Sequence, residues 1–492
     1  MFKSINKEIS LRNAGLISFC LILFAYFPLL NDRIYFVDDI TRSIKGYFGW
    51  TELGRPLTQW LAMLMTVNSE ILADITPLPQ LLSIFVLSCT GLILIRNAFS
   101  KVSIAAVLIS TTAVINPLVL GNMLYRLDSL SMVFSIMFSV LAWEKFNNGK
   151  MVQVLLLLVG CLCFYQPAIA IFPLLVVYTY LKKISHKEGM SAYILKSLFV
   201  TLTSCLVYFI FVVKFTIKST ESRGAINSFN DGLIQHTLTG IKNSTEIAFN
   251  SYGKIGSYLL LCISLIFILC YLKTLAMSVW NNNIPQKNLR ILLLLLSPIA
   301  ILICTIGVNL VLSNGYYPLR VLFPIAFIIF LMLALPSDDN ILFHNIASAL
   351  AACLLFVAVS TTYATASSLY QQQRYDSYIL FSLSQYLVSS SENKNVFIFG
   401  ATENALSSKT AMKAFPVIHY VKNNYYDMTL SQALTNNGVK NVQFSSKART
   451  ISVDLANKAC SGEANKIFST PQYSIYSNGD DLLVYLGNNN CM

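Results

Sequence analysis

The chain has 492 residues, of which 55% are hydrophobic and 12% are charged, and its formal net charge is +12. Its apolar residues stand in long uninterrupted runs, which excludes a large soluble core and identifies a polytopic α-helical membrane protein. Because the basic residues fall in short clusters between these runs, as orientation signals do, the positive charge does not indicate nucleic-acid binding, and we expect no nucleic-acid partner.

The first apolar run follows a basic flank, Met1 to Arg12, and no small-residue cleavage site follows that run. This pattern predicts an uncleaved signal anchor. Runs of the length that a bilayer requires recur along the chain and predict about eleven spans. The spans are expected at 13–31, 78–95, 103–121, 129–143, 151–165, 168–181, 194–217, 256–279, 291–312, 319–335 and 341–363. Two joints leave the count open, since 129–143 is short and Gln166 and Pro167 break the run 151–181, so either segment could be tilted or re-entrant.

Lys and Arg in the short loops predict how the chain is oriented in the membrane. If the N-terminus is cytoplasmic, the short basic loops are cytoplasmic too, and the exception is the loop Ser337 to Asn340, which carries two acids and no base. Every polar motif described below then falls on the opposite face, together with the tail from Ala364. We therefore predict a bacterial inner-membrane protein with a periplasmic functional face and a periplasmic C-terminal region.

A polar and charged segment, Asp32 to Trp60, follows the first span directly. Its acidic pair, Asp38 and Asp39, lies close to Arg42 in the sequence. The plain alternative is a solvated loop, but apolar residues from Leu57 onward recur at helical spacing, so the loop is expected to lie on the bilayer surface. A carboxylate pair at that depth is partly desolvated and flanked by cations, which makes it a candidate general base.

Three later motifs interrupt or end spans. Arg126 and Asp128 stand at the outer end of one span, where the alternative to a substrate role is that they only pair with each other. Gln166 lies between two apolar halves, where a helix break with a hydrogen-bonded Gln is the simpler interpretation. The segment Tyr316 to Arg320 suits a membrane anchor, yet an arginine there could also clamp a lipid phosphate.

The tail differs in composition from the rest of the chain, because a polar-apolar helical pattern continues outward over Ser367 to Leu387 and strand-like stretches follow it. The expected strands are Val396 to Phe399, Pro416 to Val421, Val439 to Phe444, Tyr473 to Tyr476 and Leu482 to Leu486. We therefore divide the chain into a membrane domain, 1–363, with its catalytic first periplasmic loop at 32–77, and a small soluble α+β domain, 364–492. Cys460 and Cys491 in this tail either form a disulfide on the oxidising side of the membrane or remain two unrelated thiols.

The groups that could carry chemistry are carboxylates and arginines. The 4 histidines are scattered over both sides of the membrane and a span edge, so the sequence supports neither a metal centre nor a Ser/His/Asp triad. We expect no cofactor. Asp38 and Asp39 could alternatively coordinate a divalent cation, which ranks lower because adjacent side chains alone make a poor octahedral site.

The order and spacing of these motifs resemble the type II family of O-antigen glucosyltransferases, the serotype-converting enzymes often carried by temperate phages. The residues that carry the resemblance are Asp38-Asp39-x-x-Arg42, Gly46, Trp50, Gly54-Arg55-Pro56-Leu57, Tyr125-Arg126-x-Asp128-Ser129 and Tyr165-Gln166-Pro167-Ala168. In the first part of the chain the resemblance rests on these motifs, and in the rest it rests on the arrangement of the spans. The tail carries no usable signature. It implies a membrane-embedded glycosyltransferase of the GT-C type.

The resemblance also implies substrates and partners. The donor would be undecaprenyl phosphate glucose, made by a separate glucosyltransferase and moved across the membrane by a small flippase, and the acceptor a sugar of the lipid-linked O-antigen repeat. Asp38 and Asp39 match the family's acidic pair, one of which would be the base. From the resemblance and, for Arg320, from its place at the interface, the expected donor phosphate-binding residues are Arg42, Arg55, Arg126 and Arg320, and the expected substrate-binding residues are Trp50, Tyr125, Asp128, Tyr165 and Gln166.

The chemistry of such a transfer requires the same kinds of group. Displacing a phosphate from an anomeric carbon builds positive charge on the sugar and negative charge on the leaving group, so the site needs a carboxylate and fixed cations. One base that accepts the proton of the acceptor hydroxyl is sufficient, and a single displacement inverts the anomeric centre. The rival hypotheses are a transporter or flippase for a lipid-linked saccharide, which usually shows repeat symmetry and polar residues near mid-membrane, and a scaffold protein without catalysis.

Overall fold

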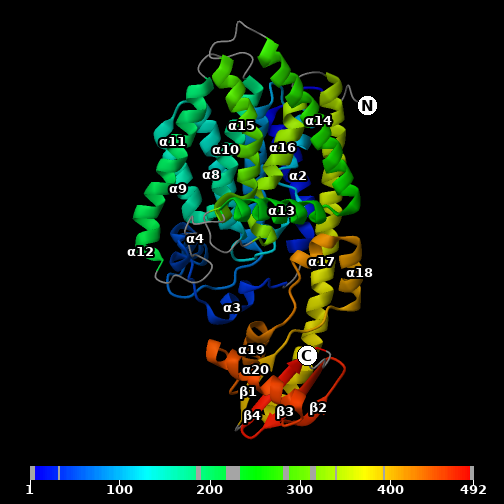
Figure 1. Cartoon of the computed structure of the whole chain (residues 1–492). Helices are drawn as coiled ribbons and strands as arrows, with labels where there is room; N and C mark the ends of the chain where they lie inside the picture. The colour runs from blue at the N-terminus through cyan, green and yellow to red at the C-terminus, as the bar shows by residue number, and fades with distance from the viewer. Residues whose placement is uncertain are drawn as a thin grey trace.

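The computed structural model describes residues 6–30, 34–183, 190–217, 233–280, 287–310, 317–337, 341–391 and 394–487. Its helices form an elongated bundle, and a small domain with a 4-stranded sheet is attached at one end (Figure 1). Most of the chain is helical, and the long helices are apolar. The predicted class, a helical membrane protein with a small C-terminal α+β domain, is therefore confirmed.

In the described part of the chain, 7 helices are long and apolar enough to cross a membrane. They are α2 (Leu11–Leu30), α5 (Leu78–Ala98), α8 (Ser129–Asn147), α11 (Met190–Tyr208) with its continuation through η3 (Phe209–Val213) and α12 (Lys214–Thr216), α14 (Gly253–Trp280), α15 (Lys287–Ile306) and α17 (Ile341–Ser390). Shorter helices complete the bundle, namely α9 (Met151–Phe164), α10 (Ile171–Lys183) and α16 (Pro324–Ser337).

The predicted count of eleven spans is not supported. The run 103–121 is two short helices, α6 (Ile104–Thr111) and α7 (Pro117–Met123), because Asn116 caps the second piece by accepting the Leu118 N–H at 3.0 Å. Pro117 suits the first turn of α7 since it has no N–H to donate. Every residue of α7 is buried, which is the setting in which interrupted helices are tolerated at membrane depth.

The bundle has buried inner helices and exposed outer ones. Nearly every residue of α16 is buried, and 72% of the apolar window of α8 is buried, against 17% for the window that spans α11 and α12. The outer helices α11, α14 and α15 expose rows of large apolar side chains, as expected for surfaces that face lipid.

The first loop lies at the end of the bundle nearest the C-terminal domain and contains α3 (Asp38–Lys45), η1 (Thr51–Leu53) and α4 (Pro56–Thr66) (Figure 1). Helix α4 confirms the helical spacing predicted from Leu57. Its Trp60 and Leu64 are 64% and 75% exposed, as expected for a helix that rests on a bilayer surface. Across the bundle axis runs α13 (Leu233–Ser251).

Helix α17 connects the bundle with the C-terminal domain as one unbroken element of 50 residues (Figure 1). At about 1.5 Å per residue it is about 75 Å long, more than twice the ~30 Å of a bilayer core. The helical pattern predicted to continue over Ser367 to Leu387 is therefore confirmed, and the helix is longer than a bilayer core requires. The helix passes residue 363, where we placed the domain boundary, without interruption.

The C-terminal sheet has the strand order β1-β4-β3-β2. Its strands are β1 (Asn395–Phe399), β2 (Asn465–Ser469), β3 (Tyr473–Asn478) and β4 (Asp481–Leu486), with β1 parallel to β4 and the other neighbours antiparallel. The remaining elements of this domain are α18 (Leu406–Ala414), η6 (Pro416–Tyr420), α19 (Asp427–Asn436) and α20 (Ser446–Ser461).

The strand predictions for the tail are partly wrong. In the predicted strand Pro416 to Val421, residues Pro416 to Tyr420 form the 3-10 turn η6, because proline cannot donate to a β-ladder and fits a first helical turn. The stretch 439–444 contributes only a bridge between Val442 and Val396. Strand β1 and the β3–β4 hairpin are confirmed, and Gly479 supplies the positive φ of 58° that its turn requires. Strand β2, which is short and mostly exposed, was not predicted.

The cysteines follow the predicted division between membrane and tail. Cys460 is disulfide-bonded. Cys491, its predicted partner, lies outside the described residues. The other cysteines that the structure describes stand in apolar helices, as small apolar residues do.

Candidate active site

The adjacent acids Asp38 and Asp39 open α3 but face different surroundings. Asp39 is 1% exposed, and its carboxylate accepts the backbone N–H of Arg126 at 2.9 Å and that of Leu127 at 3.4 Å. Burial raises the pKa of Asp39 to about 7, against the opposing effect of these backbone hydrogen bonds. Asp39 therefore fixes the first loop against the start of α8, and its carboxylate has no opening to solvent.

Asp38 is partly exposed and lines a cavity of about 580 Å³ between the end of the bundle and the C-terminal domain. The charged residues of its lining are Asp38, Arg320, Lys422 and Arg449, and we call it the basic cavity. Tyr125 forms part of its wall on the bundle side. One carboxylate and three cations thus line one hollow. Arg449 is already paired with Asp427 at 2.6 Å, and the remaining excess of positive charge favours a ligand that carries negative charge.

The backbone just before Asp38 is strained. Val37 has φ 47° and ψ −102°, a left-handed conformation that a β-branched residue rarely adopts. The side chain of Asn423, from the C-terminal domain, holds this point from two sides: its Oδ1 accepts the Val37 N–H at 3.1 Å and its Nδ2 donates to the Tyr35 carbonyl at 2.5 Å. Strain of this kind persists only where surrounding contacts maintain it, so Asn423 sets the position of Asp38.

Arg42 points into the loop itself. Its guanidinium donates to the Phe48 carbonyl and lies 3.9 Å from the centroid of the Trp50 ring. Trp50 is fully buried, with Phe48 and Leu72 beside it. The roles predicted for Arg42 in phosphate binding and for Trp50 in substrate binding stay predictions, but this placement favours a structural role, in which the pair forms the small core of the loop.

Arg55 is tied to the helix break at Gln166. Its Nε donates to Gln166 Oε1 at 3.2 Å, and its guanidinium lies 4.5 Å from the centroid of the Tyr165 ring. Gln166 in turn donates to the Leu53 carbonyl at 3.1 Å and to the Tyr208 hydroxyl at 2.9 Å. Burial lowers the pKa of Arg55, and the nearby charge of Arg320 acts in the same direction. The break between α9 and α10 therefore serves to position an arginine.

Arg320 stands where several bundle elements meet. Its guanidinium lies 4.6 Å from the centroid of the Tyr125 ring, and its carbonyl accepts hydrogen bonds from Asn122 at 3.1 Å and from the Tyr165 hydroxyl at 3.3 Å. Close approach of α7 depends on Gly121, since a Cβ there would lie 2.8 Å from the Arg320 backbone nitrogen. The structure thus brings Tyr125, Tyr165 and Arg320 together, whereas the sequence placed their motifs only on one face of the membrane.

Arg126 and Asp128 are both 5% exposed, yet in the described part of the chain they do not form the ion pair that was the alternative to a substrate role. The Arg126 guanidinium lies 5.4 Å from the centroid of the Tyr35 ring, and its Nε has no hydrogen-bond partner. Asp128 is the N-cap residue of α8, and its Oδ1 is likewise without a partner. Buried polar atoms left unpaired in this way often belong to sites that a ligand completes.

No cluster of three or more His, Cys, Asp or Glu side chains that could hold a metal ion occurs among the residues that the structure describes. The cofactor expectation stays a prediction. Three residues of this site were missed in the sequence, namely Lys422, Asn423 and Arg449. All three come from the C-terminal domain, where no motif marks them, and only the fold brings them to Asp38.

The fold and the site together define an integral membrane protein whose first loop and appended domain enclose a basic cavity at one end of its helical bundle. A family model described as "Glucosyl transferase GtrII" matches residues 26–336, more than half of the chain, and the chain belongs to this family. The matched region contains every site residue predicted from the sequence. The family resemblance inferred from the motifs is therefore confirmed.

One curated relative resembles part of the chain. It is the "Uncharacterized 55.3 kDa protein in gtrB 5'region" of Salmonella phage P22, which is 29% identical over 168 residues. The similarity covers 34% of this chain and 34% of that protein, so the chain spans about a third of the relative's length. No solved structure matches the chain significantly.

Proposed function

We propose that this protein is an inner-membrane glucosyltransferase of the GT-C type, with about eleven membrane segments, short ones included. It transfers a glucosyl group from undecaprenyl phosphate glucose to a sugar of the lipid-linked O-antigen repeat, on the periplasmic face. The observation that carries the proposal is the basic cavity, which Asp38 and three cations line at the end of the helical bundle. Family membership supports the reaction class.

In this reaction the bond between the anomeric carbon and the phosphate oxygen breaks, and a bond to the acceptor oxygen forms. Negative charge develops on the departing phosphate, and Arg320, Lys422 and Arg449 stabilise it electrostatically. The acceptor hydroxyl loses its proton to the Asp38 carboxylate. The departing polyprenyl phosphate needs no proton donor, and attack from the opposite face inverts the anomeric centre.

The two acids divide the work. Asp38 is the base because it faces the cavity, whereas Asp39 positions the loop by accepting the N–H groups of Arg126 and Leu127. Arg55 packs against the Tyr165 ring, and the Tyr165 hydroxyl donates to the Arg320 carbonyl, so Arg55 helps to position Arg320. The donor reaches this face through the separate donor-synthesising glucosyltransferase and the small flippase that the family resemblance implies. The N-terminus is then cytoplasmic and the C-terminal domain periplasmic.

The test uses the full chain solubilised in detergent, with labelled polyprenyl phosphate glucose and lipid-linked O-antigen repeat. Replacing Asp38 by Asn is expected to lower kcat by about 100-fold or more, because a general base contributes roughly 10²- to 10⁴-fold. The matched control is Asp454→Asn, an exposed acid on α20, which should transfer glucose at the wild-type rate.

Full transfer by the Asp38→Asn variant would remove the base assignment. Absence of transfer by the wild-type chain would remove the proposed function itself. Because a detergent micelle has no second leaflet, a transporter or flippase would give no product in this assay, and product formation therefore excludes that rival.

A further inference from the structure

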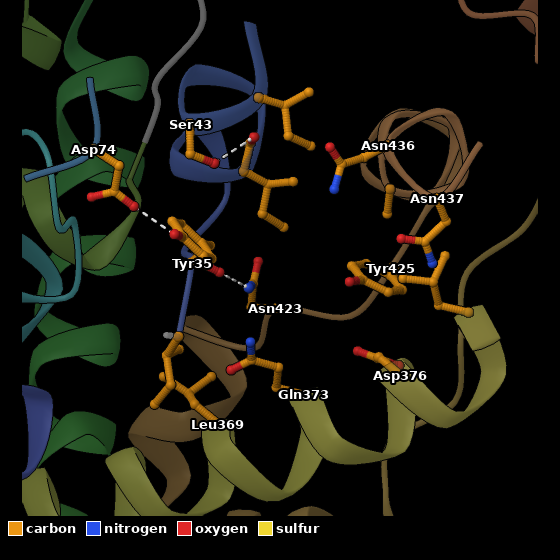
Figure 2. Close-up of a pocket in the computed structure, with 15 residues that line it drawn as sticks. Tyr35, Ser43, Asp74, Leu369, Gln373, Asp376, Asn423, Tyr425, Asn436 and Asn437 are labelled. Carbon is orange, nitrogen blue, oxygen red and sulfur yellow. Dashed lines mark hydrogen bonds between the residues drawn. The ribbon is translucent and has the colours of Figure 1, made fainter. Parts of the chain in front are cut away.

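A second cavity, of about 410 Å³, lies beside the basic cavity. It is enclosed by the first loop, by the outer half of α17 and by the segment that includes α19 (Figure 2). Four of its lining residues are side-chain amides, Gln373, Asn423, Asn436 and Asn437, and we call it the amide cavity. Its volume falls within the roughly 300–1,000 Å³ range of small-ligand sites.

The lining of the amide cavity differs in chemistry from that of the basic cavity. It has two carboxylates, Asp74 and Asp376, and no Lys or Arg among the described residues that line it. Amides both donate and accept hydrogen bonds and carboxylates accept them, which matches hydroxyl groups that do both. Apolar side chains such as Leu369 and Leu380 complete the wall. This combination suits an uncharged polyhydroxylated ligand and disfavours a phosphate.

The polar groups of this cavity are held in place before any ligand arrives. The Tyr35 hydroxyl donates to Asp74 at 2.5 Å, as Figure 2 shows. Asp376 is 2% exposed and accepts a hydrogen bond from Gln372 at 3.1 Å. Side chains fixed in this way lose little conformational freedom when they bind a ligand, which is the condition for a specific site.

The two cavities share one wall. Ile34 and Tyr35 line the amide cavity, whereas Phe36, Val37 and Asp38, the next residues of the same segment, line the basic cavity. Asn423 contacts both sides of this partition and also lines the amide cavity. Asp38 therefore stands at the end of the wall that separates the two hollows.

We propose that the amide cavity binds the uncharged saccharide of the acceptor, while the basic cavity holds the charged end of the donor. This inference rests on the proposed function. An acceptor seated in the amide cavity presents a hydroxyl past the partition toward Asp38, and the donor presents its anomeric carbon from the other side. A divalent cation is a poorer occupant, because the cavity offers two carboxylates and no metal cluster is found in the described residues.

The experiment is two-substrate kinetics on the full chain in detergent. The probes are labelled polyprenyl phosphate glucose and the lipid-linked O-antigen repeat extracted from a host strain that lacks this chain. The variants are Asn436→Leu, which removes an exposed amide at the end of α19, and Asp376→Asn, which removes a carboxylate. Their matched controls are Asn457→Leu and Asp454→Asn, both on exposed positions of α20.

For Asn436→Leu we expect the acceptor KM to rise about tenfold, since one lost hydrogen bond to a buried ligand group costs about 1–2 kcal/mol. Asp376→Asn should raise the acceptor KM by a smaller factor, because the asparagine amide keeps one acceptor oxygen. The donor KM should change by less than about twofold, and the controls should behave as wild type. An unchanged acceptor KM, or a parallel rise of both KM values, would overturn the inference. An unchanged donor KM also shows that the variant is folded, and Asn436→Leu keeps the test valid if Asp376→Asn is unstable.

A binding measurement separates this inference from the proposed function. The oligosaccharide released from its lipid by mild acid is added to the wild-type chain and to Asn436→Leu, and binding is followed by saturation-transfer NMR. Binding to wild type that weakens in the variant supports the inference even if no glucose is transferred, in which case only the proposed function fails. Equal binding, or none to either chain, overturns the inference even if transfer proceeds.

Discussion

The basic cavity and the amide cavity lie on either side of one short backbone segment, yet their linings carry opposite charge. The basic cavity has three cations and one carboxylate, and the amide cavity has two carboxylates and no cation among its described lining residues. A transferase that joins a phosphate-linked donor to a neutral acceptor needs two binding sites of different charge. The acidic lining repels the phosphate of the donor, and the basic lining binds a neutral acceptor poorly. The charge of the lining, rather than the size of the cavity, therefore indicates which substrate each cavity binds.

Among the predicted changes in substrate binding, we expect the largest from Arg320→Ala. Removing a charge-assisted contact to phosphate costs about 1.5–3 kcal/mol, so the donor KM should rise roughly 10- to 100-fold while the acceptor KM stays within about twofold. Arg320→Lys should recover part of the loss, because lysine keeps the charge without the planar fork. The measurement is steady-state kinetics with each substrate varied in turn.

The matched control for this substitution is Arg374→Ala, an exposed arginine on α17 that lines neither cavity. It should leave both KM values unchanged. If Arg320→Ala raised the acceptor KM alone, the assignment of the two cavities would be reversed.

A smaller and shared effect is expected from Asn423→Leu. This substitution removes both hydrogen bonds that hold the partition, so Val37 can relax from its strained conformation and Asp38 moves with it. We expect kcat to fall about tenfold, because misplacement of a reacting group lowers the rate. Both KM values should rise, and the acceptor KM should rise more than the donor KM because Asn423 also lines the amide cavity. Asn457→Leu is the control, and an unchanged kcat with an unchanged donor KM would contradict the role of Asn423 as a common support.

The sequence predicted the membrane class, the loop that carries the acids, and the C-terminal extension of the last long helix, because these depend on local pattern and composition. It placed the motifs of Tyr125, Tyr165 and Arg320 on one face of the membrane, but the contacts among these residues come from the structure alone. What it left open was the choice between Asp38 and Asp39. Successive residues on a helix point in different directions, and only packing against the start of α8 decides which carboxylate is buried.

Contacts between residues far apart in the chain could not be predicted from local sequence patterns. The sequence predicts that Arg42 binds phosphate. In the structure its guanidinium packs on the Trp50 ring and donates to the Phe48 carbonyl within the loop. Lys422 and Arg449 lie in a tail without a recognisable motif, and they reach the basic cavity only because the chain after α17 turns back toward the bundle, with α18 beside α17 (Figure 1). Long-range contacts of this kind leave no periodic trace along the chain.

The smallest predicted effect compares the two buried acids, Asp39 beside the partition and Asp376 in the amide cavity. Burial raises the pKa of each to about 7. An unfolded aspartate titrates near 3.9, so between about pH 4 and 7 the folded protein holds a proton that the unfolded chain has released. The stability that each group contributes is therefore complete below about pH 4 and is lost as the pH rises through 7.

Thermal unfolding of the detergent-solubilised chain between pH 5 and pH 7.5 tests this prediction. Wild-type Tm should fall with rising pH by a few degrees, since each group changes stability by at most about 1.4 kcal/mol per pH unit. Asp376→Asn and Asp39→Asn should each flatten this slope, because asparagine mimics the protonated acid at every pH, whereas the exposed Asp454→Asn should leave it unchanged. A slope that flattened for Asp39 alone would mean that Asp376 is ionised in the folded protein, and the amide cavity would then carry its full negative charge at neutral pH.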